Sequence, residues 1–79
     1  MADWYLSAAL KLKEIAERDP KLAALIYATV RRLEKQPTNG EYLKETRRML
    51  TNKEDGFRIS YNCHQKAKKI EIVTIHVTD

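Results

Sequence analysis

Arg58 and His76 are two residues of types that could act together on a phosphate ester. A guanidinium binds phosphate bidentately and keeps its charge, and an imidazole can accept or donate a proton near neutral pH. Cleavage of RNA needs an activated 2′-hydroxyl, a stabilised phosphate charge and a protonated leaving oxygen. Arg58 and His76 can contribute only if the fold brings them to one surface. The alternative is that Arg58 is an ordinary surface arginine beside a polar strand residue.

Two segments are predicted to be the strands that carry these residues. Apolar and polar side chains alternate over 57–63, which predicts a half-buried strand. Residues 69–77 are rich in Ile, Val and Thr, which favours a strand. In the second segment Val73 shares a predicted apolar face with Lys69 and Glu71, and the apolar phase slips near Ile72 and Val73. The slip predicts a bulge or burial on both faces.

Pairing the apolar faces of these strands predicts an antiparallel register. The predicted pairs are Phe57–Val77, Ile59–Ile75 and Tyr61–Val73 on one face, with Arg58–His76 and Ser60–Thr74 on the other. Directly opposed residues lie about 5 Å apart between Cβ atoms. A shift of two residues would keep the faces but place Arg58 and His76 diagonally. The hypothesis is a sheet with one face for helices and one for a ligand.

Two helices are predicted before these strands. Ser7 is a candidate cap for a first helix that continues to about Arg18. Asp19-Pro20 predicts the start of a second helix, and the Pro37 to Gly40 segment ends it. The short connection makes the helices antiparallel neighbours. The pattern over residues 41–51 is ambiguous. One interpretation is a helical turn followed by a strand over 47–51.

Length and composition limit the possible classes. The chain has 79 residues, which predicts a single domain, 1–79, with a net charge of +4. That charge fits nucleic acid, the ribosome or an acidic protein partner, but also an ordinary soluble surface. One cysteine and two histidines predict neither a disulfide nor a metal site, and no cofactor is expected. No long apolar run or signal peptide is found, so we expect a cytoplasmic protein without a membrane partner.

Several segments resemble the RelE/ParE superfamily, the toxins of toxin–antitoxin pairs. The segments are LSAALKLKEI (6–15), VRRLEKQP (30–37), YLKE (42–45), GFRISY (56–61) and KIEIVTIHV (69–77). In YLKE, Glu45 stands where the family has glycine. The resemblance implies an α+β fold: a helical hairpin packed on a small curved antiparallel sheet, in the order short strand, two helices and three strands.

The resemblance also implies a function and partners. Members of the RelE type cut mRNA inside the ribosome, members of the ParE type poison DNA gyrase, and an antitoxin wraps both through a segment that folds on contact. We therefore expect a toxin, with ribosome-associated mRNA endonuclease as the first alternative. The second is a non-enzymatic binding protein, either a gyrase inhibitor or a catalytically inactive module. A third is a structural protein that forms a homodimer through its helical hairpin.

The resemblance places Arg58 in the active face and matches Arg47 and Arg48 to basic residues of the preceding strand. The candidate catalytic residues are Arg58, His76 and Arg48, and the candidate RNA contacts are Arg47, Lys44, Tyr42, Lys53 and His64. Nucleases of the family carry a further His or Tyr beyond the last strand, whereas His76 lies within it and the sequence stops at Asp79. Whether the protein is an enzyme is therefore left open. Cys63 is expected to be an inert core residue.

Overall fold

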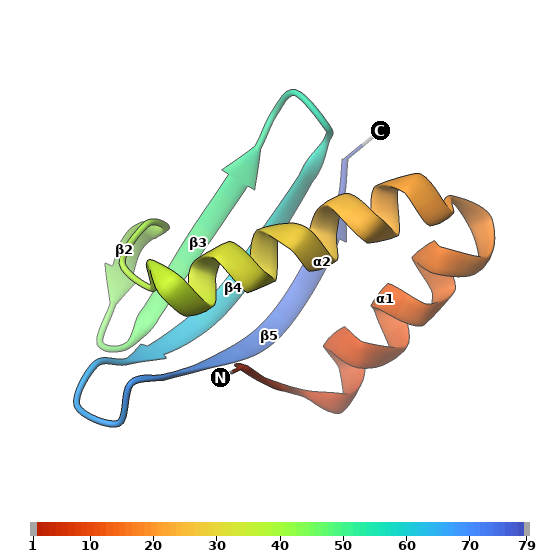
Figure 1. The fold of residues 1–79 in the computed structure, drawn as a ribbon. Coiled ribbons are helices and arrows are strands. Elements are labelled where there is room, and N and C mark those ends of the chain that lie inside the picture. The colour runs from red at the N-terminus through yellow and green to blue at the C-terminus, as the bar shows by residue number, and fades with distance from the viewer. Residues whose placement is uncertain (1, 79) are drawn as a thin grey trace.

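Two helices pack on one face of a five-stranded sheet (Figure 1). This computed structural model describes residues 2–78. The elements in chain order are β1 (Ala2–Trp4), α1 (Leu6–Arg18), α2 (Pro20–Lys35), β2 (Glu41–Lys44), β3 (Arg47–Asn52), β4 (Phe57–His64) and β5 (Lys69–Val77). The α+β class, the helical hairpin and the two predicted strands of the final hairpin are confirmed.

The sheet has the strand order β1-β5-β4-β3-β2 and is mixed rather than wholly antiparallel. Strand β1 runs parallel to β5, with Ala2 opposite Ile70 and Trp4 opposite Ile72, and the other neighbours are antiparallel. The helical turn considered near residue 41 is wrong, because Glu41–Lys44 forms an edge strand on β3. Strands β1 and β2 therefore cover both outer edges of the β5-β4-β3 core, whose backbone groups would otherwise lack partners.

Local signals set the helix boundaries with one exception. The Asp19 carboxylate accepts a hydrogen bond from the Leu22 amide at 3.2 Å, and Pro20 opens α2, as predicted. Helix α1 begins at Leu6 without a side-chain cap, so the prediction that Ser7 caps it is wrong. Instead the Tyr5 amide donates to the Ile72 carbonyl at 2.9 Å, and the chain passes directly from the sheet into the helix.

A bulge in the β4–β5 ladder decides which residues face the helices. The pairs Arg58–His76 and Ser60–Thr74 are confirmed, as are the apolar pairs Phe57–Val77 and Ile59–Ile75. After Ser60 the register shifts, so Tyr61 lies opposite Ile72 instead of Val73, and that predicted pair is wrong. The shift turns Ile70 and Ile72 toward the helices, where both are buried. It also overturns the predicted placement of Lys69 and Glu71 on the apolar face.

The core lies between the sheet and both helices. Its fully buried large side chains are Tyr61, Phe57, Ile26, Leu33, Ile59, Ile70, Ile72 and Val30. Cys63 is buried in the same cluster, as expected for an inert core thiol. The Tyr61 hydroxyl donates to the Pro37 carbonyl at 2.7 Å and accepts from the Gly40 amide at 2.9 Å. These two bonds tie the loop after α2 to the centre of the sheet.

Candidate functional site

The face of the sheet turned away from the helices carries most of the candidate residues. We call it the open face, because α1 and α2 both lie on the other side (Figure 1). Residues paired across an antiparallel ladder share a face. On the three central strands the open-face residues are Arg47, Met49 and Thr51 of β3, Arg58, Ser60, Asn62 and His64 of β4, and Lys69, Glu71, Thr74 and His76 of β5.

Arg58 and His76 lie directly opposite one another at one end of the open face. Both side chains are exposed. Among residues 2–78, neither makes a hydrogen bond or an ion pair with another side chain. The guanidinium and the imidazole are therefore available to an anionic ligand, but nothing in the described chain fixes their orientation.

A hydrogen-bonded group lies at the other end of the open face, beside the β4–β5 turn. We call Arg47, Asn62, Glu71 and His64 the hairpin cluster. The His64 Nε2 and Glu71 Oε1 atoms are 2.7 Å apart, and Asn62 Nδ2 lies 3.4 Å from the same carboxylate oxygen. Arg47 Nε donates to Asn62 Oδ1 at 2.9 Å. The chain of contacts thus runs across three strands.

The electrostatics of the cluster centre on Glu71. The hydrogen bond from His64, followed by that from Asn62, lowers the pKa of the Glu71 carboxyl below its usual value of 4.5. Next to it, the Lys69 ammonium is 2.6 Å from an Asp3 carboxylate oxygen, and this contact raises the pKa of Lys69. Glu71 is therefore ionised at neutral pH and acts as an acceptor only.

Sequence reasoning proposed His64 and Arg47 as RNA contacts but missed Glu71 and Asn62. On the predicted register Glu71 would lie opposite Cys63, on the helix side. The bulge instead places it opposite Asn62 on the open face. The available signal was the interruption near Ile72 in the alternation of apolar and polar residues. That interruption does not identify which residues change face.

Arg48 lies on the other side of the sheet from Arg58. Adjacent strand residues point to opposite faces, and Arg48 pairs with the buried Tyr61. Its Nη1 donates to the Gly40 carbonyl at 2.9 Å and to the Thr38 carbonyl at 3.3 Å. The prediction that Arg47 and Arg48 form one working face with Arg58 is wrong, and only Arg47 shares the open face.

The other predicted RNA contacts fall into separate places. Tyr42 is on the Arg48 side, where the guanidinium carbon lies 5.5 Å from its ring centroid. Tyr42, Arg48 and His64 line one hollow of about 480 Å³. Lys44 is the register partner of Arg47, and both line a hollow of about 380 Å³ together with Asn62. Lys53 is exposed in the β3–β4 turn, at the Arg58 end.

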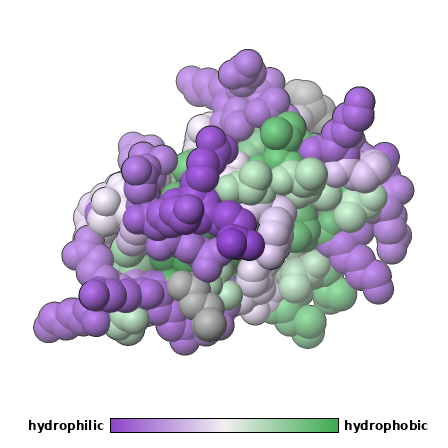
Figure 2. Space-filling view, in the orientation of Figure 1, coloured by the Kyte–Doolittle hydropathy of each residue, from purple (hydrophilic) through white to green (hydrophobic). Residues whose placement is uncertain are grey.

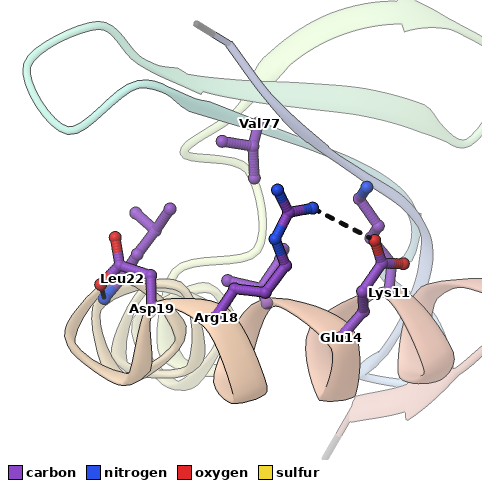
Figure 3. Close-up of a pocket in the computed structure, with 7 residues that line it drawn as sticks. Lys11, Glu14, Arg18, Asp19, Leu22 and Val77 are labelled. Atoms are coloured by element: carbon purple, nitrogen blue, oxygen red, sulfur yellow. Dashed lines mark hydrogen bonds and ion pairs between the residues drawn. The ribbon is translucent and has the colours of Figure 1, made fainter.

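The largest of the hollows described lies elsewhere, between the helices and the end of β5 (Figure 3). It measures about 560 Å³ and contains none of the predicted site residues. Arg18 and Glu14 form an ion pair at 3.7 Å along its rim, and both side chains are more than half exposed. Such a surface pair stabilises little, and we assign this hollow no role.

Within residues 2–78, no group of three or more His, Cys, Asp or Glu side chains is placed to hold a metal ion. No helix in that range is long and apolar enough to cross a membrane.

No protein-family model matches the sequence, and no curated protein is similar to it. Solved structures are similar in fold. The isolated E. coli RelE toxin superposes with a TM-score of 0.82 at 8% identity, over 100% of this chain and 84% of that one. A chain of the intact E. coli RelBE toxin–antitoxin complex gives 0.79 at 8% identity, over 100% and 96%. The YoeB/ParE toxin from Agrobacterium tumefaciens gives 0.73 at 18% identity, over 99% and 98%. The chain has the RelE/ParE toxin fold.

Proposed function

We propose that this protein is the toxin of a toxin–antitoxin pair and cleaves mRNA on translating ribosomes. The observation that carries the proposal is the open face, where Arg58 and Arg47 flank a helix-free surface that also holds His64 and His76. Phosphodiester cleavage uses cations that stabilise the phosphate charge and side chains that can transfer a proton. The shared fold with RelE and YoeB/ParE toxins supports the proposal.

The residues have distinct roles in this proposal. Arg58 binds backbone phosphate, because its guanidinium is exposed and has no partner in the described chain. Arg47 and Lys44 contact RNA beside their common hollow, and Lys53 adds charge at the Arg58 end. His76, opposite Arg58, is the sequence-based candidate for proton transfer. Arg48 acts indirectly, by holding the loop that leads into β2.

An antitoxin is the proposed protein partner. Apolar side chains are exposed on the helices, with Leu6 at 74% and Leu10 at 56% exposed. Hydrophobic residues reach the surface over α1 on the helix side (Figure 2). A complex of the RelBE type, in which a related fold occurs with its antitoxin, supports this partner class. The cytoplasm, where ribosomes and mRNA meet, is the proposed compartment.

A translation assay tests the nuclease proposal. The purified protein is added to a reconstituted translation reaction, and the mRNA is mapped by primer extension. We expect cleavage that depends on ribosomes and falls at least about 10-fold in Arg58→Ala, since one phosphate contact is lost. Arg18→Ala, an exposed helix arginine on the other side, is the matched control and keeps wild-type cleavage. Intact mRNA and unchanged translation with the wild-type protein would refute the proposal.

A non-enzymatic binding role is the second candidate. The exposed Leu6 and Leu10 of α1 favour it, because apolar helix surface suits a protein partner such as DNA gyrase. A supercoiling assay separates the two candidates. Gyrase inhibition that persists in Arg58→Ala, without mRNA cleavage, would support the binding role. Uninhibited gyrase would exclude that target.

A further inference from the structure

The turns after β2 and after β4 lie at the same end of the sheet and border one hollow (Figure 1). The hollow measures about 480 Å³ and is lined by β2, β3, the end of β4 and both turns, without a residue of either helix. The Cys63 amide donates a hydrogen bond of 2.7 Å to the Thr46 carbonyl, which ties the first turn to β4. Because no helix covers this end of the sheet, a ligand can enter the hollow from solvent.

Tyr42 supplies an aromatic surface in this hollow. It is 56% exposed, and the Arg48 guanidinium carbon lies 5.5 Å from its ring centroid. Arg48 is itself held, because its Nη1 donates to the Gly40 carbonyl at 2.9 Å and to the Thr38 carbonyl at 3.3 Å. The cation therefore restrains one side of the Tyr42 ring, and the other side is left for a planar ligand.

The charged groups around this ring favour an anion. Arg48 and Lys66 outnumber the single carboxylate of the lining, Glu45, so the hollow has a net positive charge. Lys66 lies in the β4–β5 turn, is exposed and makes no hydrogen bond or ion pair within residues 2–78. An ammonium of this kind contributes affinity for phosphate that does not depend on sequence. An aromatic ring next to an unpaired cation is complementary to a nucleotide, which offers a flat base and a phosphate.

We propose that this hollow, which we call the turn hollow, binds one nucleotide of single-stranded RNA. The base stacks on the uncovered side of Tyr42, and the phosphate contacts Lys66. The choice of RNA rests on the proposed function, but this site holds RNA and takes no part in cutting it. His64 lines the turn hollow and also contacts Glu71 on the open face. An RNA strand on the open face therefore reaches the turn hollow around the end of the sheet.

Binding of free RNA tests the stacking contact. The dissociation constant of a short fluorescein-labelled oligoadenylate is measured by fluorescence anisotropy without ribosomes. Tyr42→Ala should raise it at least about fivefold, the effect of losing one base–aromatic stack. Tyr42→Leu, which keeps apolar bulk without a ring, should lose as much, and Tyr42→Phe should stay within about twofold. The matched control is Tyr27→Ala on α2, where a tyrosine of similar exposure lies away from the hollow. Wild-type affinity in Tyr42→Ala overturns the proposal.

Amide NMR spectra locate the site and identify the part of the ligand that binds. Adenosine monophosphate should shift the signals of residues 45–46 and 63–67, and Tyr42→Leu should abolish these shifts. Inorganic phosphate should shift them much less, because it has no base to stack. Equal shifts with phosphate, or shifts confined to the Arg58 end of the open face, overturn the proposal.

The salt dependence tests the phosphate contact. Lys66→Ala should reduce the slope of log affinity against log salt by about 0.7, the value for one phosphate of a single strand. An unchanged slope removes Lys66 from the site. Thermal melts verify that each variant is folded. Oligoadenylate binding that depends on Tyr42, without mRNA cleavage on ribosomes, supports this proposal and refutes the proposed function. Cleavage on ribosomes with wild-type RNA affinity in Tyr42→Ala refutes this proposal alone.

Discussion

Removing one hydroxyl from the centre of the core should destabilise the protein strongly. In Tyr61→Phe the ring keeps its packing, but the bonds to the Pro37 carbonyl and the Gly40 amide are lost. A lost hydrogen bond costs about 1 kcal/mol, and a buried amide left without an acceptor costs about 1–3 kcal/mol. The expected loss of unfolding free energy is therefore about 2–4 kcal/mol.

Urea denaturation followed by circular dichroism measures this loss. With an m-value of about 1–1.5 kcal/mol/M for a chain of this size, the midpoint falls by roughly 1.3–4 M. Hydrogen exchange gives a local readout, because the Gly40 amide loses its acceptor and should lose protection.

The matched control is Tyr27→Phe, since Tyr27 is 49% exposed and its hydroxyl has no partner among the described residues. It should change stability by less than about 0.5 kcal/mol. A Tyr61→Phe variant that is as stable as Tyr27→Phe and keeps Gly40 protection would show that the two bonds do not anchor the loop.

Three further predictions concern the loops and the hairpin cluster. Gly40→Ala should cost about 1–3 kcal/mol by the same urea assay, because its Cβ would lie 2.5 Å from the Tyr61 hydroxyl oxygen. Glu45→Gly should stabilise the protein by about 0.5–1 kcal/mol, since Glu45 has a φ of 54° in the left-handed region. Glu71→Gln should differ most from wild type at neutral pH. The lowered pKa of Glu71 makes its contribution present above the unfolded value of 4.5 and lost as the pH falls through the folded value.

Each of these has a result that contradicts it. Wild-type stability in Gly40→Ala would mean that the Tyr61 ring can move aside. A destabilised Glu45→Gly would mean that the Glu45 side chain contributes more than its backbone strain costs. Lys68→Gly, at a φ of 52°, is the parallel case and should change stability in the same direction. A difference between wild type and Glu71→Gln that stays constant from pH 7 to pH 3 would exclude a lowered pKa.

Local chemistry in the sequence was sufficient to predict much of the fold. Asp19-Pro20 specifies a helix start for two local reasons. The Asp19 carboxylate accepts a hydrogen bond from a backbone amide of the first turn, and Pro20 has no amide hydrogen that needs a partner. The alternation from Phe57 to Cys63 specifies a strand and its buried side, since successive residues point to opposite faces. The pairing of Arg58 with His76 followed from matching the apolar faces, and it is confirmed.

Long-range pairing was not predictable in the same way. The parallel pairing of β1 with β5 joins residues far apart in the chain, and no local pattern encodes it. Arg47 and Arg48 look equivalent in the sequence, yet the strand separates them onto opposite faces and commits Arg48 to the loop carbonyls.

The candidate site shows the same division at the level of one residue. The sequence by itself determined that Arg58 and Asn62 lie on the polar face of one strand, because strand periodicity is local. Only the tertiary structure decided that this strand continues to His64 and that Glu71 joins these residues. One unpaired residue in the β4–β5 ladder rotates the rest of β5, and this exchanges an apolar neighbour of Asn62 for a carboxylate within reach of His64. The position of a bulge depends on the packing on both faces of the sheet. The sequence of a single strand does not encode that packing.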